Sequence, residues 1–338
     1  MPEIAPHRQA VLLLAHGTPQ SLDQIPEYLR NITSGRPMPE SVVEEIRHRY
    51  SLIGSSPLTE LTMEQGRLLS EALNLPVYVG MRNWKPYIAD VVRQMRDDGI
   101  TSAVAICLAP QNSRTSVGLY RRAAFAEAGG AIEMNFIDGW ADHPQLAQAF
   151  AERLQPVWQS LSARIGSMAP VLFTAHSVPC RTIQVQAPAA TGQPDPKPDL
   201  GPDPYPVEAK RTAANVAALV APLGLTDADW FFAFQSQGMS GATWIGPTVE
   251  DTLTALRQEG HAAVVIQPIG FLCDHVEILY DIDIGFRDFA AGIGLEVVRP
   301  QSLNDSPLLT ATLEDLARQG FARLAAKVPS EALSAPAV

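Results

Sequence analysis

The chain has 338 residues, of which 46% are hydrophobic and 18% charged, and its formal net charge is −11. These values are typical of a globular protein long enough for two domains with sizeable cores. The acidic balance disfavours binding to a nucleic-acid backbone and suits a cationic substrate. Neither a signal-peptide pattern nor an apolar run near the ~20 residues that span a bilayer is present, so we expect a cytoplasmic protein without a transmembrane segment.

The first half of the chain alternates short apolar runs with helical patterns. Such alternation with short connections predicts a parallel sheet covered by helices on both faces. Strands are expected at 11–15, 77–81, 103–109 and 134–137, and helices at 41–53, 61–73 and 88–98.

The second half repeats this alternation, and we expect two domains, 1–160 and 161–338. Residues 184–206 contain seven prolines, which excludes a helix or central strand and predicts a loop near the mouth of a cleft. Strands are expected at 171–175, 231–234, 264–268 and 295–299, and helices at 208–221, 249–259 and 307–327, with a helix at 144–159 joining the halves.

An internal repeat relates the two halves. Ala15-His16-Gly17-Thr18-Pro19 recurs as Ala175-His176-Ser177-Val178-Pro179, and in both copies the pentapeptide follows an apolar run. Pro86, Asp90, Arg96 and Gly99 match Pro247, Asp251, Arg257 and Gly260. Two related halves predict two similar lobes with a cleft between them.

Polar residues occur where several expected strands end. His16, Gln111, His176 and the segment after Pro268 all follow such strands. In open α/β sheets, ligands bind beyond the carboxyl ends of the strands, so these residues are expected to surround one cleft. The imidazole of His176 is a usable proton acceptor near neutral pH. The alternative is a structural, hydrogen-bonding histidine.

An acidic segment follows Pro268. A helix here would place Asp274, Glu277, Asp281 and Asp288 on one face, while His275 and Asp283 would point elsewhere and be structural. One imidazole with one carboxylate suits iron(II) or zinc held weakly enough to be released. The alternative is a solvated acidic face.

Arg49, Tyr50 and Ser56 lie in a helix and the turn after it, where carboxylate recognition is one interpretation and an ordinary surface the other. The three cysteines, Cys107, Cys180 and Cys273, are too few and too widely spaced for an iron–sulfur cluster or a disulfide framework.

Taken together, these motifs resemble those of the ferrochelatase family over about residues 10–325. The resemblance includes the family's His-Ser-x-Pro motif and its Asp-His-x-Glu-x-Leu-Tyr-Asp motif. The matching segments are Ala175–Pro179, Asp274–Asp281, Gln235-Ser236 with Trp244–Pro247, Asp203–Tyr205, Gly17–Pro19, Arg49–Leu58 and Ala109–Gln111.

The resemblance implies two Rossmann-like lobes with parallel sheets and a central cleft, and insertion of ferrous iron into a porphyrin in haem biosynthesis. His176 and Glu277 would be the catalytic and metal-binding pair. No cofactor beyond the Fe(II) substrate is expected. A peripheral membrane contact, an iron donor or a neighbouring haem-pathway enzyme are the partners it allows. His16, Arg49, Tyr50, Ser56 and Gln111 would bind the porphyrin, and Asp274, Asp281 and Asp288 would form an accessory acid row.

The chain also departs from the family pattern. Some members carry tyrosine in place of His16, an acid in place of Gly285 and two arginines in place of Thr33 and Ser34. Protoporphyrin IX and coproporphyrin III therefore both stay open as substrates. The alternatives are a cobalt or nickel chelatase for another tetrapyrrole, and a non-catalytic two-lobed haem- or porphyrin-binding protein.

Overall fold

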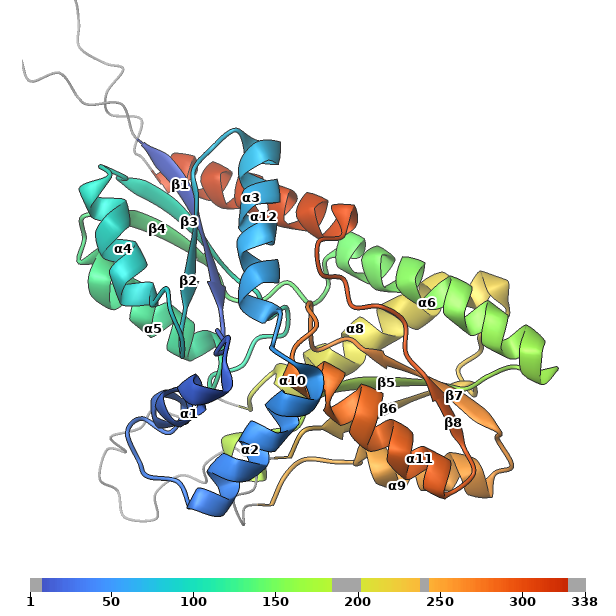
Figure 1. Ribbon diagram of the computed structural model, residues 1–338. Helices are drawn as coiled ribbons and strands as arrows, with labels where there is room; N and C mark the ends of the chain where they lie inside the picture. The colour runs from blue at the N-terminus through green and yellow to red at the C-terminus, as the bar shows by residue number, and fades with distance from the viewer. Residues whose placement is uncertain (1–7, 184–201, 238–242, 328–338) are drawn as a thin grey trace, which may run out of the picture.

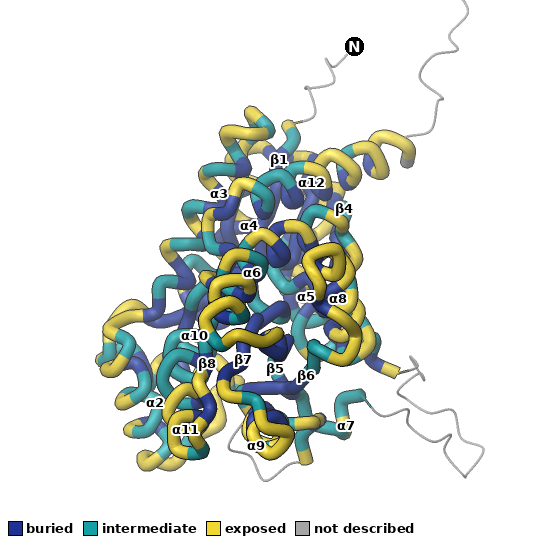
Figure 2. Tube along the Cα trace, turned by 90° about the vertical axis from the view of Figure 1, so that its right-hand side faces the viewer, coloured by how far each residue is buried: buried dark blue, intermediate teal, exposed yellow. Residues whose placement is uncertain are grey.

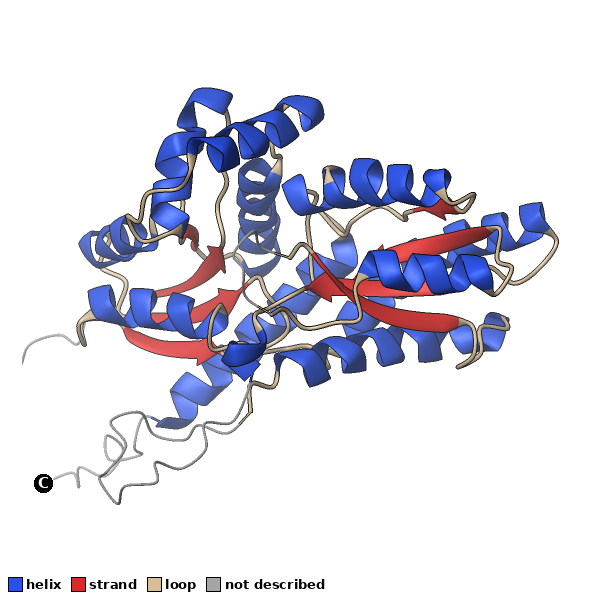
Figure 3. Ribbon diagram, turned by 90° about the horizontal axis from the view of Figure 1, so that it is seen from below, coloured by secondary structure: helices blue, strands red, loops and turns tan. Residues whose placement is uncertain are grey.

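In the computed structural model, which describes residues 8–183, 202–237 and 243–327, the chain forms two α/β lobes, each built on a four-stranded parallel sheet (Figure 1). Helices lie on both faces of each sheet (Figure 3), so the central strands are almost completely buried. The eight strands in these described residues are β1 (Gln9–Ala15), β2 (Val77–Met81), β3 (Ser102–Cys107), β4 (Glu133–Ile137), β5 (Val171–His176), β6 (Trp230–Gln235), β7 (Ala263–Pro268) and β8 (Glu296–Val298).

The two sheets have the same strand order. It is β2-β1-β3-β4 in the first sheet and β6-β5-β7-β8 in the second, so each strand of the first corresponds to the strand four places further along the chain. All neighbouring strands are parallel. This topology confirms the two similar lobes that the internal repeat predicts.

Each sheet has an outer face with its own hydrophobic cluster. In the first lobe, α4 (Ile88–Asp97) and α5 (Val117–Ala128) cover Leu12 and Leu14 of β1. In the second, α9 (Val249–Gln258) and α11 (Arg287–Gly292) pack in the cluster that contains Leu172 of β5.

The inner faces of both sheets belong to one continuous core. Its helices are α3 (Leu58–Leu73), α6 (Pro144–Ile165), α8 (Tyr205–Val220) and α12 (Pro307–Lys327). Phe150 and Trp158 of α6 are fully buried in this core. Figure 2 shows the buried strands β5 to β7 beneath helices whose outer faces are exposed.

Helix α12 differs from the sequence-based assignment, which placed it with the second half. It packs on α3, β3 and β4 of the first lobe and on α6 (Figure 1). Gly320 allows this close approach, because a Cβ atom there would lie 2.5 Å from a methyl carbon of Val104 in β3. The C-terminal helix therefore completes the first lobe.

Three described α-helices were not predicted: α1 (Ile25–Ile32), α5 and the four-residue α7 (Cys180–Ile183). Helix α1 is short, and the buried face of α5 consists largely of small residues such as Ala124 and Ala128, which give a weak apolar stripe. Helix α1 packs with α2 (Glu40–Ile53) and with Val276 of the second lobe.

The predicted proline-rich loop 184–206 lies outside the described residues from 184 to 201. The described part ends in α8, which begins at Tyr205 with Pro206 in its first turn, where proline is tolerated. Among the helices that the structure describes, none is both long and apolar enough to cross a membrane.

Candidate active site

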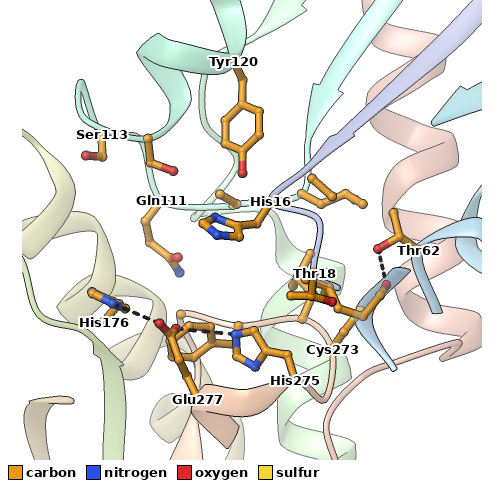
Figure 4. A pocket seen from close by; sticks show the side chains of 18 of the residues that line it. His16, Thr18, Thr62, Gln111, Ser113, Tyr120, His176, Cys273, His275 and Glu277 are labelled. Carbon is orange, nitrogen blue, oxygen red and sulfur yellow. Dashed lines mark hydrogen bonds and ion pairs between the residues drawn. The ribbon is translucent and has the colours of Figure 1, made fainter. Parts of the chain in front are cut away.

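A cavity of about 310 Å³ lies where the carboxyl ends of the two sheets meet. Four residues that the sequence analysis selected line it together: His16, Gln111, His176 and Glu277 (Figure 4). His16 follows β1, and His176 is the last residue of β5, so the repeated topology brings equivalent positions of the two lobes to one cavity.

His176 and Glu277 form the central pair of the cavity. The Nε2 atom of His176 lies 3.3 Å from Oε1 of Glu277, and its Nδ1 contacts the carbonyl oxygen of Ser177. The two side chains are 35% and 33% exposed, and they point into the cavity (Figure 4). Tyr205 donates a hydrogen bond of 2.8 Å from its hydroxyl to the carbonyl oxygen of His176, which fixes the end of β5.

Electrostatics make this pair an ion pair at neutral pH. Burial, the largest single influence, opposes both charged forms, but the attraction and hydrogen bond between the two groups outweigh it together with the contributions of other neighbours. The pKa of His176 is thereby raised to about 9, with help from the Ser177 carbonyl and Asp281, and the pKa of Glu277 is lowered. The resting pair is therefore an imidazolium beside a carboxylate.

His275 corrects one expectation from the sequence, because it points into the cavity rather than away from it. Its Nε2 atom lies 3.6 Å from Oε2 of Glu277, and its ring packs against Phe271. The Nδ1 atom is buried and has no hydrogen-bond partner among the described residues. Burial lowers the pKa of His275, so this second imidazole beside Glu277 is neutral.

The acid row also differs from the expected single helix face. The segment is a turn of α-helix, α10 (Val276–Leu279), followed by a π-helix, η3 (Asp281–Phe286), and then by α11. The wider π-helical turn changes the angular spacing on which the prediction depended. Asp288 is exposed to solvent, and Asp274 precedes the helix, so Glu277 and Asp281 are the members that stay together.

Asp281 is contacted by residues from both lobes. Its carboxylate accepts a hydrogen bond from Ser236, whose left-handed backbone (φ +61°) follows β6, and it lies 3.6 Å from Nη1 of Arg49 in α2. Burial, followed by the negative charge of Glu277, raises the pKa of Asp281 to about 6. Arg49 also pairs with Glu45 and lies over the ring of Tyr280.

His16 lies on the first-lobe side of the cavity (Figure 4). Its Nε2 atom is 3.1 Å from the hydroxyl of Tyr28, and the side-chain amide of Asn83 is within 3.2 Å of the ring nitrogens. Burial, assisted by the positive charge of Arg82, lowers the pKa of His16 to about 4. The imidazole is therefore neutral and has a lone pair at physiological pH.

The other predicted porphyrin contacts are distributed differently. Gln111 lines the cavity and donates to Thr212 Oγ1 and to the carbonyl oxygen of Ile269. Arg49, Tyr50 and Ser56 are not among the residues that line the cavity. Tyr50 is buried with α1 and α2, and Ser56 accepts a hydrogen bond from Thr18. Tyr50 and Ser56 were expected to face the cavity. The sequence alone does not show which side of a helix or turn packs against other elements, so this expectation could not be checked without the structure.

Sequence reasoning missed several cavity residues, notably His275, Tyr28, Tyr120 and Tyr205. His275 and Tyr205 belong to motifs that the sequence analysis quoted, so a signal was present. Tyr28 and Tyr120 lie in α1 and α5, neither of which was predicted. Within the described residues, no group of three or more His, Cys, Asp or Glu side chains is placed to hold a metal ion.

Solved structures with the same overall fold include SirB, a sirohydrochlorin chelatase of Bacillus subtilis determined with cobalt. The TM-score is 0.54 at 10% sequence identity, and the match covers 95% of this chain and 98% of that chain. A structure of SirB with Fe³⁺ gives a TM-score of 0.55 at 12% identity, with the same coverage. These likenesses define the class: a two-lobed α/β protein with the chelatase fold.

Sequence comparison narrows this class. Residues 8–321 match the ferrochelatase family model, and the chain belongs to the ferrochelatase family. It is 68% identical to a ferrochelatase of Acidobacterium capsulatum over 97% of this chain and 99% of that protein. It is 33% identical to a coproporphyrin III ferrochelatase of Geobacillus kaustophilus over 92% of this chain and 96% of that protein. The protein is accordingly an enzyme that inserts iron into a porphyrin in haem biosynthesis.

Proposed function

We propose that His176 and Glu277 carry out metal insertion, with the porphyrin bound between them and His16. The observation that carries this proposal is the ion pair of His176 and Glu277, which faces His16 across one cavity. Insertion must remove two protons from the pyrrole nitrogens while Fe(II) loses its water ligands. A carboxylate that receives a cation and an imidazole that receives protons supply these two requirements.

The ion pair of His176 and Glu277 suggests an order in which metal arrival comes before removal of the pyrrole protons. At neutral pH the imidazolium of His176 is stabilised by the carboxylate of Glu277. When Fe(II) approaches Glu277, its positive charge replaces the favourable interaction, and the proton of His176 is lost to solvent, to which this side chain is 35% exposed. As the metal moves on to the porphyrin, the neutral imidazole accepts one pyrrole proton at a time and releases it to solvent, so that the two protons leave in succession. Asp281, next along the segment, supplies negative charge beyond Glu277 for the incoming metal.

Which porphyrin is used is tested directly by mixing the protein anaerobically with Fe(II) and either protoporphyrin IX or coproporphyrin III, and by following absorbance. We expect turnover with at least one of them. Cobalt(II) with sirohydrochlorin tests the alternative chelatase. Spectral changes of binding without turnover in every mixture would instead favour a non-catalytic binding protein.

The ion pair predicts a pH dependence for metal binding. A metal ion must displace the proton held by His176, whose pKa is about 9. Affinity for Co(II), a redox-stable substitute for Fe(II), should therefore rise by up to about tenfold per pH unit below that pKa and level off above it. Calorimetric titration across this range measures the slope. An affinity that does not change with pH would contradict the assigned protonation state.

His16→Tyr should change the spectrum of the bound product. A neutral imidazole facing the ring can ligate its iron through nitrogen, whereas tyrosine offers oxygen, so the Soret band of bound iron porphyrin should shift. His48→Tyr, on α2 and remote from the cavity lining, is the matched control and should leave the band in place. Identical spectra for His16→Tyr and the unchanged protein would exclude His16 as a ligand.

Several expectations from the sequence remain predictions: the absence of a further cofactor or iron–sulfur cluster, the cytoplasmic location, and contacts with a membrane surface, an iron donor or a neighbouring haem-pathway enzyme. The three cysteines are free thiols, with Cys107 and Cys273 buried.

A further inference from the structure

We propose that Arg299 is a positioning residue for metal insertion, because it ties together the two ends of the segment that carries Glu277 and Asp281. This inference rests on the proposed roles of those two acids. Arg299 follows β8, 16 residues after Asp283 in the sequence, and it does not line the cavity. Its effect on the reaction would therefore pass through other residues.

The guanidinium of Arg299 contacts both ends of the segment. Its Nε and Nη2 atoms donate to the two carboxylate oxygens of Asp283 at 2.7 Å each. Its Nη1 atom lies 3.3 Å from Oδ1 of Asp274. The side chain of Arg299 is 10% exposed, and those of Asp274 and Asp283 are 19% and 23% exposed, so solvent screens this cluster only partly.

Neighbouring groups complete the attachment of Asp274. Ser302 donates to Oδ1 of Asp274 at 2.6 Å, and the side-chain amide of Asn304 donates to Oδ2 at 2.9 Å. The backbone N–H of Asp274 donates to the side-chain oxygen of Asn304 at 2.9 Å. The loop that follows β8 thus holds the start of the segment, while the fork of Arg299 holds Asp283.

The reacting side chains lie between these two fixed ends. His275 and Glu277 point into the cavity, and Asp281 contacts Ser236. On the side of the segment that faces β6, Gln235 holds it in place, because the side-chain amide of Gln235 donates to the carbonyl oxygen of Glu277 at 2.8 Å. The segment is therefore held by the end of β6 on one side and by Arg299 on the other.

The π-helix makes this restraint important. π-Helices are rare and occur as short, functional interruptions of α-helices, so the π-helical turn from Asp281 to Phe286 needs tertiary contacts. Without Arg299, Asp274 and Asp283 would be two partly buried carboxylates without a close cation. Arg287 lies 3.9 Å from Asp283 but is itself 52% exposed, so it cannot supply the same fork.

Arg299→Lys tests the clamp, because lysine keeps the positive charge but lacks the planar fork that binds Asp283 through two nitrogens. We expect kcat to fall by roughly ten- to hundredfold and KM for Fe(II) to rise, since small displacements of reacting groups have effects of this size. KM for the porphyrin should stay within about twofold, because Arg299 does not line the cavity.

Arg164→Lys is the matched control. Arg164 pairs with Glu296, the first residue of β8, at 2.6 Å, but both side chains are exposed and neither residue belongs to the segment. This variant should have unchanged kinetics. Unchanged kcat and KM for Fe(II) in Arg299→Lys would overturn the proposal, and so would an equal rise in KM for the porphyrin.

A variant that lacks the charges of Asp274, Asp283 and Arg299 keeps the proposal testable if Arg299→Lys does not fold. Asp274→Asn, Asp283→Asn and Arg299→Met together remove the charged cluster without leaving a buried charge unpaired. This triple variant should fold, as judged by a cooperative thermal transition, and still insert iron slowly. Wild-type kinetics in it would overturn the clamp.

Glu277→Gln, assayed in parallel, separates this proposal from the proposed function. If Glu277→Gln is inactive while Arg299→Lys is normal, the clamp alone is wrong. If Glu277→Gln is fully active, the assignment of the acid segment fails, and the proposal for Arg299 fails with it.

Discussion

His176→Ala should decrease the rate of iron insertion by about 10²- to 10⁴-fold, the range expected when a positioned proton-transfer group is lost. The imidazole faces the cavity and lies 3.3 Å from Oε1 of Glu277, whereas the second imidazole beside this carboxylate, that of His275, lies 3.6 Å from the other oxygen, Oε2. Folding should be preserved, because Tyr205 bonds to the backbone of residue 176 rather than to its side chain.

The measurement is single-turnover absorbance with a saturating porphyrin, together with porphyrin affinity by fluorescence, which should change little. His261→Ala is the matched control, since His261 is also 35% exposed and lies near a glutamate, yet it is remote from the cavity. It should keep normal turnover. A comparable loss in both variants, or normal turnover in both, would remove His176 from the mechanism.

Glu277→Gln should cause a similarly large loss, by two routes. The amide cannot receive a divalent cation as the carboxylate does, and it no longer raises the pKa of His176. With burial then dominant, that pKa should fall well below about 9, which NMR titration of the imidazole would measure. The affinity for metal rises with pH only up to the pKa of His176. In Glu277→Gln it should therefore level off at a lower pH than in the unchanged protein.

Two aspartates of the same segment act as graded controls for this result. Asp281→Asn should lose less activity, because Asp281 lies one turn beyond Glu277. Asp288→Asn should have no effect, because Asp288 is exposed. Equal turnover of all three variants and the unchanged protein would mean that the acid segment has no part in metal insertion.

The strands and the duplication could be predicted from the sequence because both depend on local patterns. Buried parallel strands are continuous apolar runs, and the strand 77–81 was predicted with the bounds that the structure shows. The sequence also allowed the prediction that His16, Gln111, His176 and Glu277 meet at one cavity, since parallel topology places the carboxyl ends of strands at one edge of a sheet.

The details of the acid segment could not be predicted in the same way. The expected common face of Asp274, Glu277, Asp281 and Asp288 assumes an α-helical period, and the π-helical turn changes that period. Its partners, Arg299 and Asn304, come from a different loop, so no local pattern links them to Asp274. His275 escapes the prediction for another reason: it precedes α10 with an extended backbone, so a helical period does not apply to it.

The position of α12 has a consequence for how the chain acquires its structure during synthesis. Residues 307–327 supply part of a layer of the first lobe, so in a ribosome-bound chain that ends after β4 the inner sheet face has α3 but still lacks α12. Such an intermediate exposes Val104 and its neighbours, which favours aggregation or chaperone binding until translation is nearly complete. For the same reason, a fragment of residues 1–160 should fold less stably by itself than the same fragment with residues 307–327 joined to it through a flexible linker.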